Sequence, residues 1–285
     1  MQLNKALYKK FYNLARQKTW ITKPRHEDAF FALVDNCSSE QDIELLFRLF
    51  ERFHYLTQED VTAHLSGMMD SAFQQWLFPP SATQIVASHP STDPDSSQFI
   101  MQMLKPVLRR KELTVGKVFN KLFDAVNYCG TFPHILIVDE FVGTGRTMFK
   151  RVNDLKSRIK QKVSDSKKPV DIKIGVVTIA AMKAGADFLR DNEILFSCQL
   201  ELSRGISDQF VEPMLTDFSN SMRRLESELA PEIDGHKLPS FGRGKAEALY
   251  AIEESNIPNS VFPIYWWCKD KHMRVRKTHF DRLEP

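Results

Sequence analysis

The fold is decided by the stretch His134-Ile-Leu-Ile-Val-Asp-Glu-Phe-Val-Gly-Thr-Gly-Arg-Thr147. Its aliphatic part, Ile135 to Val138, is short and uniformly apolar, which is typical of a strand buried on both faces rather than of an amphipathic helix. A loop of small residues follows, and Met148 to about Lys162 has the pattern of a helix. The order of strand, tight loop and helix predicts an α/β unit.

The loop between this strand and this helix has the chemistry of an anion site. The first N–H groups of a helix have no partner within the helix, so they can bind a phosphate. Gly145 lets the backbone approach a ligand closely, and Thr144 and Thr147 add hydroxyl donors. Asp139 and Glu140, at the predicted strand end, can accept hydrogen bonds from sugar hydroxyls. These residues predict a site for a phosphorylated ribose.

A Walker A phosphate loop is excluded at two positions. That loop requires Gly-x-x-x-x-Gly-Lys-Ser/Thr. Glu140 stands five residues before Gly145, where its charge would repel a phosphate, and Arg146 stands where the lysine would be.

The stretch resembles the phosphoribosyl pyrophosphate (PRPP) signature of type I phosphoribosyltransferases, in which a hydrophobic strand, two acids and three variable residues precede Thr/Ser-Gly-x-Thr. Its defined positions are filled by Asp139, Glu140, Thr144, Gly145 and Thr147. The resemblance implies that the loop holds the 5′-phosphate and that the acids hold the ribose hydroxyls close to a magnesium ion. It also implies that the substrate is PRPP or a nucleotide such as NAD.

Two positions of the loop are variable in that signature. Gly143 can donate its amide. In the 6-oxopurine transferases an Asp at this position works at the base, so a guanine or hypoxanthine acceptor is not expected here. Arg146 is expected either to point at the phosphate or to be a solvated residue at the helix start, and the sequence leaves both open.

A second loop in this family holds pyrophosphate through backbone N–H groups. Its positional match is the polar segment from Ser88 to Ser97. The hydroxyl residues expected to contact phosphate there are Ser88, Ser91 and Thr92. An ordinary surface loop is the alternative, because Asp93 and Asp95 would repel pyrophosphate.

The pattern along the chain predicts two parts. Residues 1–80 are expected to be a helical accessory region, with Ser39 and Asp42 capping one helix. Residues 81–285 are expected to form the phosphoribosyltransferase-like domain, an α/β fold with a mostly parallel sheet flanked by helices, because strands alternate with helices. The finer expectations are strands at 83–87 and 261–267 and helices over 117–128 and 246–252.

Composition places the chain among ordinary soluble proteins. It has 285 residues, of which 42% are hydrophobic and 26% charged, and its formal charge of +3 is too small to imply nucleic-acid binding. No apolar run reaches the roughly 18 residues of a membrane span, and no signal peptide is recognised at the N-terminus. Four widely spaced cysteines favour free thiols and a cytoplasmic protein.

The C-terminal part carries a second, narrower resemblance. Phe241-Gly-Arg-Gly244 with Pro258-Asn-Ser-Val-Phe-Pro-Ile-Tyr-Trp266 is similar to the tail of phosphoribosyltransferase-like proteins of bacterial conflict systems, including retron-associated effectors. This implies a toxic effector of an anti-phage system, held inactive by protein partners or in a nucleoprotein complex, and an oligomer is conceivable. The basic segment from Lys269 to Arg282 is expected either to follow a nucleic-acid backbone or to be a solvated terminus.

Two functions from different classes follow. The first is an enzyme that transfers or hydrolyses a phosphoribosyl group. The second is a non-catalytic nucleotide-binding regulator or scaffold on the same fold, because a fold does not establish an activity.

Overall fold

A computed structural model describes residues 5–91, 96–164 and 171–282. The chain divides into two compact units, of which unit 1 comprises residues 1–56 and 203–285 and unit 2 comprises residues 57–202. Unit 1 is therefore discontinuous in sequence. The boundary expected at residue 80 lies inside unit 2, and the C-terminal segment belongs to the same unit as the first three helices.

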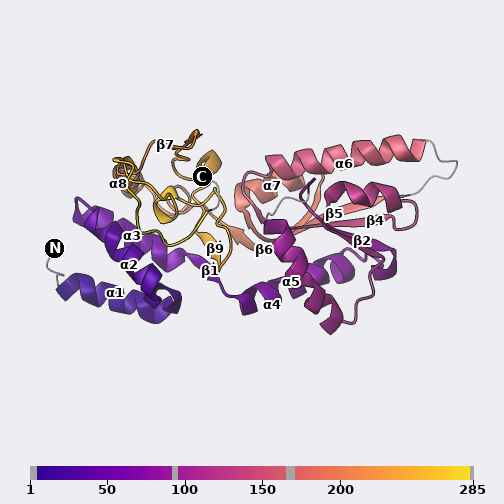
Figure 1. Ribbon diagram of the computed structural model, residues 1–285, viewed down its shortest axis with the longest axis horizontal. Coiled ribbons are helices and arrows are strands. Elements are labelled where there is room, and N and C mark those ends of the chain that lie inside the picture. The colour runs from indigo at the N-terminus through magenta and orange to yellow at the C-terminus, as the bar shows by residue number, and fades with distance from the viewer. Residues whose placement is uncertain (1–4, 92–95, 165–170, 283–285) are drawn as a thin grey trace. The chain divides into compact units, whose positions relative to one another are not determined.

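Unit 2 is built around a five-stranded sheet in which every pair of neighbouring strands is parallel. The strand order is β3-β2-β4-β5-β6 (Figure 1). The strands are β2 (Thr83–Ala87), β3 (Lys117–Phe119), β4 (His134–Val142), β5 (Lys173–Met182) and β6 (Leu195–Leu202). The expected α/β class with a mostly parallel sheet is confirmed.

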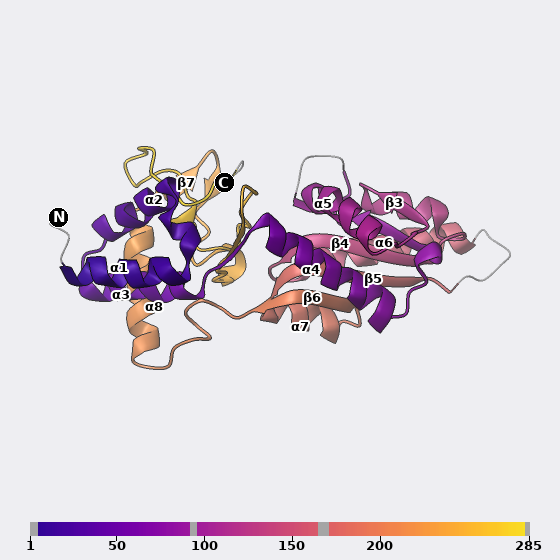
Figure 2. The same ribbon diagram turned by 90° about the horizontal axis from the view of Figure 1, so that it is seen from below.

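Helices cover both faces of this sheet, as Figures 1 and 2 show. One face packs against α6 (Arg146–Ser164), α7 (Lys183–Asp191) and a 3₁₀ segment at 122–128. The other packs against α4 (Gln58–Asp70) and α5 (Ser96–Arg110). Because the sheet is covered on both sides, the run from Ile135 to Val138 is completely buried, as its uniform apolarity predicted.

The strand order creates a topological switch point between β2 and β4. After β2 the chain moves outward to β3, then returns past β2 to β4 and continues to β5 and β6 on the other side. The two strands pair in register, with Ala87 opposite Val138. In open α/β sheets, ligands bind outside the carboxyl ends of the strands at such a point, because the two following loops diverge there and leave a crevice.

Unit 1 is mainly helical. Its helices are α1 (Lys5–Gln17), α2 (Pro24–Asp35), α3 (Glu40–Arg52) and α8 (Met214–Ser227). Two short parallel strands, β1 (His54–Leu56) and β9 (Tyr250–Ile252), join the two sequence segments of the unit, and β7 (Glu232–Ile233) pairs with β8 (His236–Lys237). The capping box of Ser39 and Asp42 at the start of α3 is confirmed.

A cluster of aromatic rings forms part of the core of unit 1. Trp20, Phe50, Phe53, Tyr265 and Phe280 are buried and in mutual ring contact. Phe50 and Phe53 are therefore core residues. Because Phe280 comes from the C-terminal segment, that segment packs against the unit at this residue, whereas its residues 271–275 are exposed.

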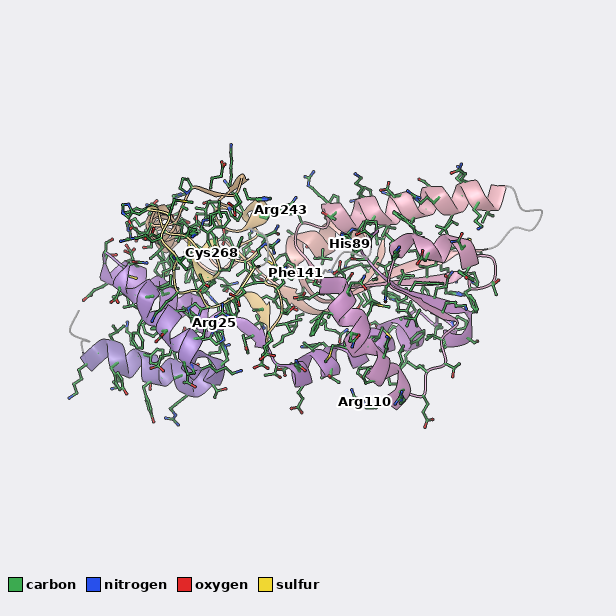
Figure 3. The ribbon with its side chains drawn as sticks, in the orientation of Figure 1. Arg25, His89, Arg110, Phe141, Arg243 and Cys268 are labelled. Carbon is green, nitrogen blue, oxygen red and sulfur yellow. The ribbon has the colours of Figure 1, made fainter. Side chains whose placement is uncertain are left out.

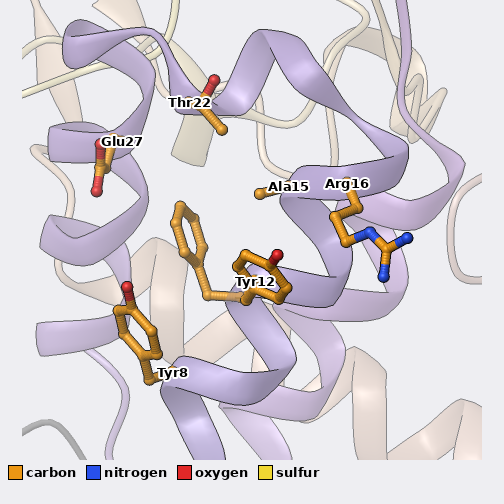
Figure 4. A pocket seen from close by; sticks show the side chains of 7 residues that line it. Tyr8, Tyr12, Ala15, Arg16, Thr22 and Glu27 are labelled. Carbon is orange, nitrogen blue, oxygen red and sulfur yellow. The ribbon is translucent and has the colours of Figure 1, made fainter.

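At the surface of unit 1, two tyrosines of α1 border a pocket of about 260 Å³ (Figure 4). Tyr8 is 60% exposed and Tyr12 56% exposed, whereas Phe11 between them is buried. Thr22 and Glu27 line the same pocket.

Three local predictions were wrong. Residues 117–128 form β3 and a 3₁₀ segment instead of one helix, and 246–252 end in β9 instead of a helix. The predicted strand at 261–267 is a 3₁₀ turn at Pro263–Tyr265. β9 forms because residues 54–56 pair with it, and the sequence separation of nearly 200 residues hides that partner from a local pattern.

Among the described residues, no helix is both long enough and apolar enough to cross a bilayer. The four cysteines are free thiols, as their spacing suggested.

Candidate functional site

Two candidate residues meet at the switch point of unit 2. Ser88 follows the last residue of β2, and Asp139 lies on the neighbouring strand β4. The Ser88 hydroxyl donates a hydrogen bond of 2.5 Å to Asp139 Oδ2, and the Ser88 amide continues the strand ladder to the Val138 carbonyl. Ser88 is fully buried and Asp139 is 8% exposed. The structure thus joins a residue of the second loop to a residue of the PRPP-like motif.

An arginine that the sequence did not single out completes this group. Arg151, in the second turn of α6, donates from Nη1 to Ser88 Oγ at 2.9 Å. The same Nη1 lies 3.7 Å from Asp139 Oδ2. The carboxylate, the hydroxyl and the guanidinium therefore form one network that links β2, β4 and α6.

The loop from Gly143 to Thr147 connects β4 directly to α6. Gly145 has a φ of +76°, which favours glycine over residues with a side chain. Thr144, Arg146 and Thr147 are exposed. Helix α6 begins at Arg146, so the amides of the first turn open toward the loop and carry the partial positive charge of the helix dipole. The order of strand, loop and helix agrees with the sequence, and anion binding at this loop stays a prediction.

Glu140 is placed differently from Asp139. The strand β4 extends to Val142, so both acids lie within it and not at its end as expected. Successive residues of a strand point to opposite faces, which directs Glu140 away from the face that carries Asp139 and α6. Glu140 is 1% exposed, and its amide donates to Asp139 Oδ1 at 2.8 Å.

These positions bear on the magnesium ion that the resemblance implies. Magnesium is usually held by one or two carboxylates together with substrate phosphates. Here both oxygens of Asp139 accept hydrogen bonds, a guanidinium faces one of them, and Glu140 belongs to the opposite face. Within the described ranges no group of three or more His, Cys, Asp or Glu side chains is arranged to hold a metal. The residues therefore do not fit a chelate made by both acids.

The loop after β2 contributes a second unforeseen residue. His89 accepts a hydrogen bond at Nδ1 from the Ser91 amide at 3.2 Å, so its imidazole fixes the start of this loop. In Figure 3, His89 and Phe141 lie at the same end of unit 2. Thr92, Asp93 and Asp95 lie outside the described residues.

Arg151 had a sequence signal that local motif reading missed. It follows Thr147 by four residues, and residues four apart lie on the same side of a helix. A cation at this position therefore lies on the same side of α6 as Thr147, which belongs to the predicted anion site. No comparable signal distinguished His89 from the other scattered histidines.

A family model and a solved structure match this chain. A family model described as PRTase-CE matches residues 32–276. Among solved structures, the chain is similar to orotate phosphoribosyltransferase from Aeropyrum pernix, with 13% identity over 48% of this chain and 68% of that chain and a TM-score of 0.30. The comparison with curated protein sequences found no match.

Proposed function

The chain belongs to the PRTase-CE family, and we propose that it binds PRPP or a ribonucleotide at the carboxyl ends of β2 and β4. The loop from Gly143 to Thr147 would hold the 5′-phosphate, and Asp139 would accept hydrogen bonds from the ribose hydroxyls.

The observation that carries this proposal is the contact between Ser88 and Asp139 at the topological switch point. This contact puts the motif strand beside the start of the second loop, where the phosphate loop and the carboxylate would contact two ends of one ligand. A phosphoribosyl compound carries a phosphate at one end and ribose hydroxyl groups beside it.

Two outcomes at this site are chemically distinct. A transferase or hydrolase breaks the bond at C1 of ribose through a transition state that resembles an oxocarbenium ion, so Asp139 would act by electrostatic stabilisation of that cation. A regulator would bind the same ligand and leave the bond intact. The family name favours the first class, and the product analysis below decides between them.

The test is calorimetric titration with ribose 5-phosphate and PRPP, followed by incubation with PRPP, NAD and nucleotides and mass spectrometry of the products. Binding of either phosphoribosyl compound supports the proposal. Released pyrophosphate, free base or a new glycosidic product identifies an enzyme, whereas binding with unchanged ligand identifies a regulator. If neither phosphoribosyl compound binds the folded protein, with or without magnesium, the proposal is wrong.

We further propose a cytoplasmic role in anti-phage defence, with a protein partner. The support is the resemblance of the segments 241–244 and 258–266 to conflict-system proteins and the four reduced cysteines. Exposed Tyr8 and Tyr12 favour a protein over a nucleic acid, because exposed aromatics are enriched at protein interfaces. Phage plaque counts on host cells that carry the gene for this chain with its native flanking genes, intact or with Asp139→Asn, test this role: equal counts with and without these genes would refute it.

A further inference from the structure

Arg151 has more hydrogen-bonding capacity than its contacts use. A guanidinium carries five N–H donors in a planar fork. In the described part of the chain, Arg151 contacts Ser88 Oγ and Asp139 Oδ2, both through Nη1. The side chain is 22% exposed, so it is partly buried but still accessible from solvent.

The Arg151 guanidinium lies beside the start of the second loop, at Ser88, and not at the 5′-phosphate loop. Its direct hydrogen bond is to Ser88, the first residue after β2. A phosphoryl group that contacts the second loop would therefore lie beside this guanidinium. Such a group would also approach Asp139, and the two negative charges would repel each other unless a cation stood between them.

In many phosphate sites that cation is a metal ion. The acids of this site do not converge on one ion, because the Arg151 guanidinium already lies 3.7 Å from Asp139 Oδ2 and Glu140 belongs to the opposite face of β4. Arg151 supplies a positive charge beside Ser88 and Asp139. Its planar guanidinium can also hold two oxygens of one phosphoryl group.

We propose that Arg151 binds the phosphoryl group on the C1 side of the ligand, beside Ser88, and supplies the positive charge there without a divalent metal. This inference rests on the proposed function, since it names the residue that distinguishes a ligand with phosphoryl groups at both ends of ribose from one with a 5′-phosphate alone. Arg151 is a binding and specificity residue in this account.

The test compares PRPP with ribose 5-phosphate by calorimetry in EDTA and again with magnesium. The variants are Arg151→Met, which removes the charge, and Arg151→Lys, which keeps the charge but loses the fork. The matched control is Arg158→Met, because Arg158 lies on the same helix and stacks on Phe123 4.1 Å away. Thermal melts and circular dichroism establish that each variant is folded.

In EDTA, wild type is expected to bind PRPP about tenfold or more tightly than ribose 5-phosphate, since charged hydrogen bonds have that magnitude. Arg151→Met should abolish this preference and leave the affinity for ribose 5-phosphate within about threefold, and Arg151→Lys should retain part of it. Arg158→Met should bind as wild type does.

The inference is overturned if the preference for PRPP exists only with magnesium, or if Arg151→Met keeps the preference. It is also overturned if Arg151→Met weakens both ligands equally while remaining folded. In each of these cases wild type still binds a phosphoribosyl ligand, so the proposed function survives. Failure of wild type to bind either compound in both buffers would instead refute the proposed function. If Arg151→Met is unfolded, Arg151→Lys decides. The inference is wrong if this variant prefers PRPP over ribose 5-phosphate as strongly as wild type does, both in EDTA and with magnesium.

Discussion

Gly185 in α7 packs directly against Gly143 of the motif loop: a Cβ built on Gly185 would lie 2.1 Å from the Gly143 carbonyl oxygen. The contact is reciprocal, because a Cβ on Gly145 would lie 2.7 Å from the Gly185 carbonyl oxygen. Three glycines therefore determine how closely the loop approaches α7. The loop position depends on a helix that follows a different strand.

Gly185→Ala is expected to weaken binding of ribose 5-phosphate by about tenfold or more, because a displacement of about 1 Å is enough to spoil such a site. Alanine would ordinarily stabilise a helix by about 0.5–1 kcal/mol relative to glycine, so a loss of binding cannot be attributed to helix propensity. Calorimetry measures the affinity. Gly130→Ala is the control, because a Cβ at Gly130 meets no atom within 4 Å. Wild-type affinity in Gly185→Ala would contradict the proposed role of the loop.

Asp139→Asn is expected to lower the affinity for ribose 5-phosphate by about tenfold, because hydrogen bonds to a charged group contribute about 1.5–3 kcal/mol. Binding of inorganic phosphate, which needs only the loop, should change little. Titration of both ligands into the variant separates the two contributions. Asp154→Asn, on the exposed side of α6, is the matched control. An equal loss for both ligands would mean that Asp139 supports the loop and does not contact ribose.

Arg224→Met is expected to destabilise unit 1 by about 1–3 kcal/mol, because it leaves a buried carboxylate without its cation. The Asp42 side chain is 1% exposed, and Arg224 Nη2 lies 2.5 Å from its Oδ1. Burial raises the pKa of Asp42, but hydrogen bonds from Arg224, Ser221 and Ser38 outweigh this effect and lower that pKa to about 2.

The sign of the pH effect at Asp42 follows from this lowered pKa. The carboxylate contributes stability above its unfolded pKa of about 3.9, and the contribution is lost as pH falls toward 2. Denaturant unfolding of Arg224→Met between pH 2 and 7 should show a smaller acid-dependent loss than wild type. Arg48→Met, which removes an exposed pair with Glu44, should leave the curve unchanged. Identical pH curves for Arg224→Met and wild type would contradict the assignment.

His279 is expected to make unit 1 sensitive to acid. It is fully buried, and burial, followed by the nearby charges of His26, Arg25 and Arg276, lowers the pKa of His279 well below 6.5. The pKa of His26 is lowered to about 4, chiefly by burial. The unfolded chain then binds more protons than the folded chain below pH 6.5, so stability falls as pH decreases through that range.

Replacement by a neutral ring tests this. His279→Phe should reduce the difference in melting temperature between pH 7.5 and pH 5, because one proton-binding group of the unfolded chain is removed. His236→Phe, at an exposed position, is the control. If His279→Phe keeps the full wild-type difference, His279 is not the group responsible.

The parts of the fold that depend on residues close in sequence could be predicted from local patterns. The strand Thr83–Ala87 was predicted with its bounds, and Ser39 and Asp42 were recognised as a capping box, because both patterns lie within a few residues. The motif loop was placed between β4 and α6 for the same reason. The site residues Asp139 and Ser88 were singled out separately, but their hydrogen bond requires the order of the strands, which no local pattern contains.

The features that were missed depend on partners distant in sequence. Residues 250–252 form a strand because they pair with residues 54–56. The charge of the C-terminal segment predicts a solvated or nucleic-acid-binding tail, and its residues 271–275 are exposed, but Arg276 donates to the Trp267 carbonyl and Phe280 is buried in the core of unit 1. Arg151 was overlooked because its role appears only when α6 is packed on the sheet.

The most direct test of the central claim is the difference electron density of a crystal grown with ribose 5-phosphate at a saturating concentration. The account predicts a phosphate on the amides of the loop from Gly143 to Thr147 and ribose hydroxyls within hydrogen-bond distance of Asp139. The account would be contradicted if the ligand density lay elsewhere while this loop was ordered and had no ligand bound to it.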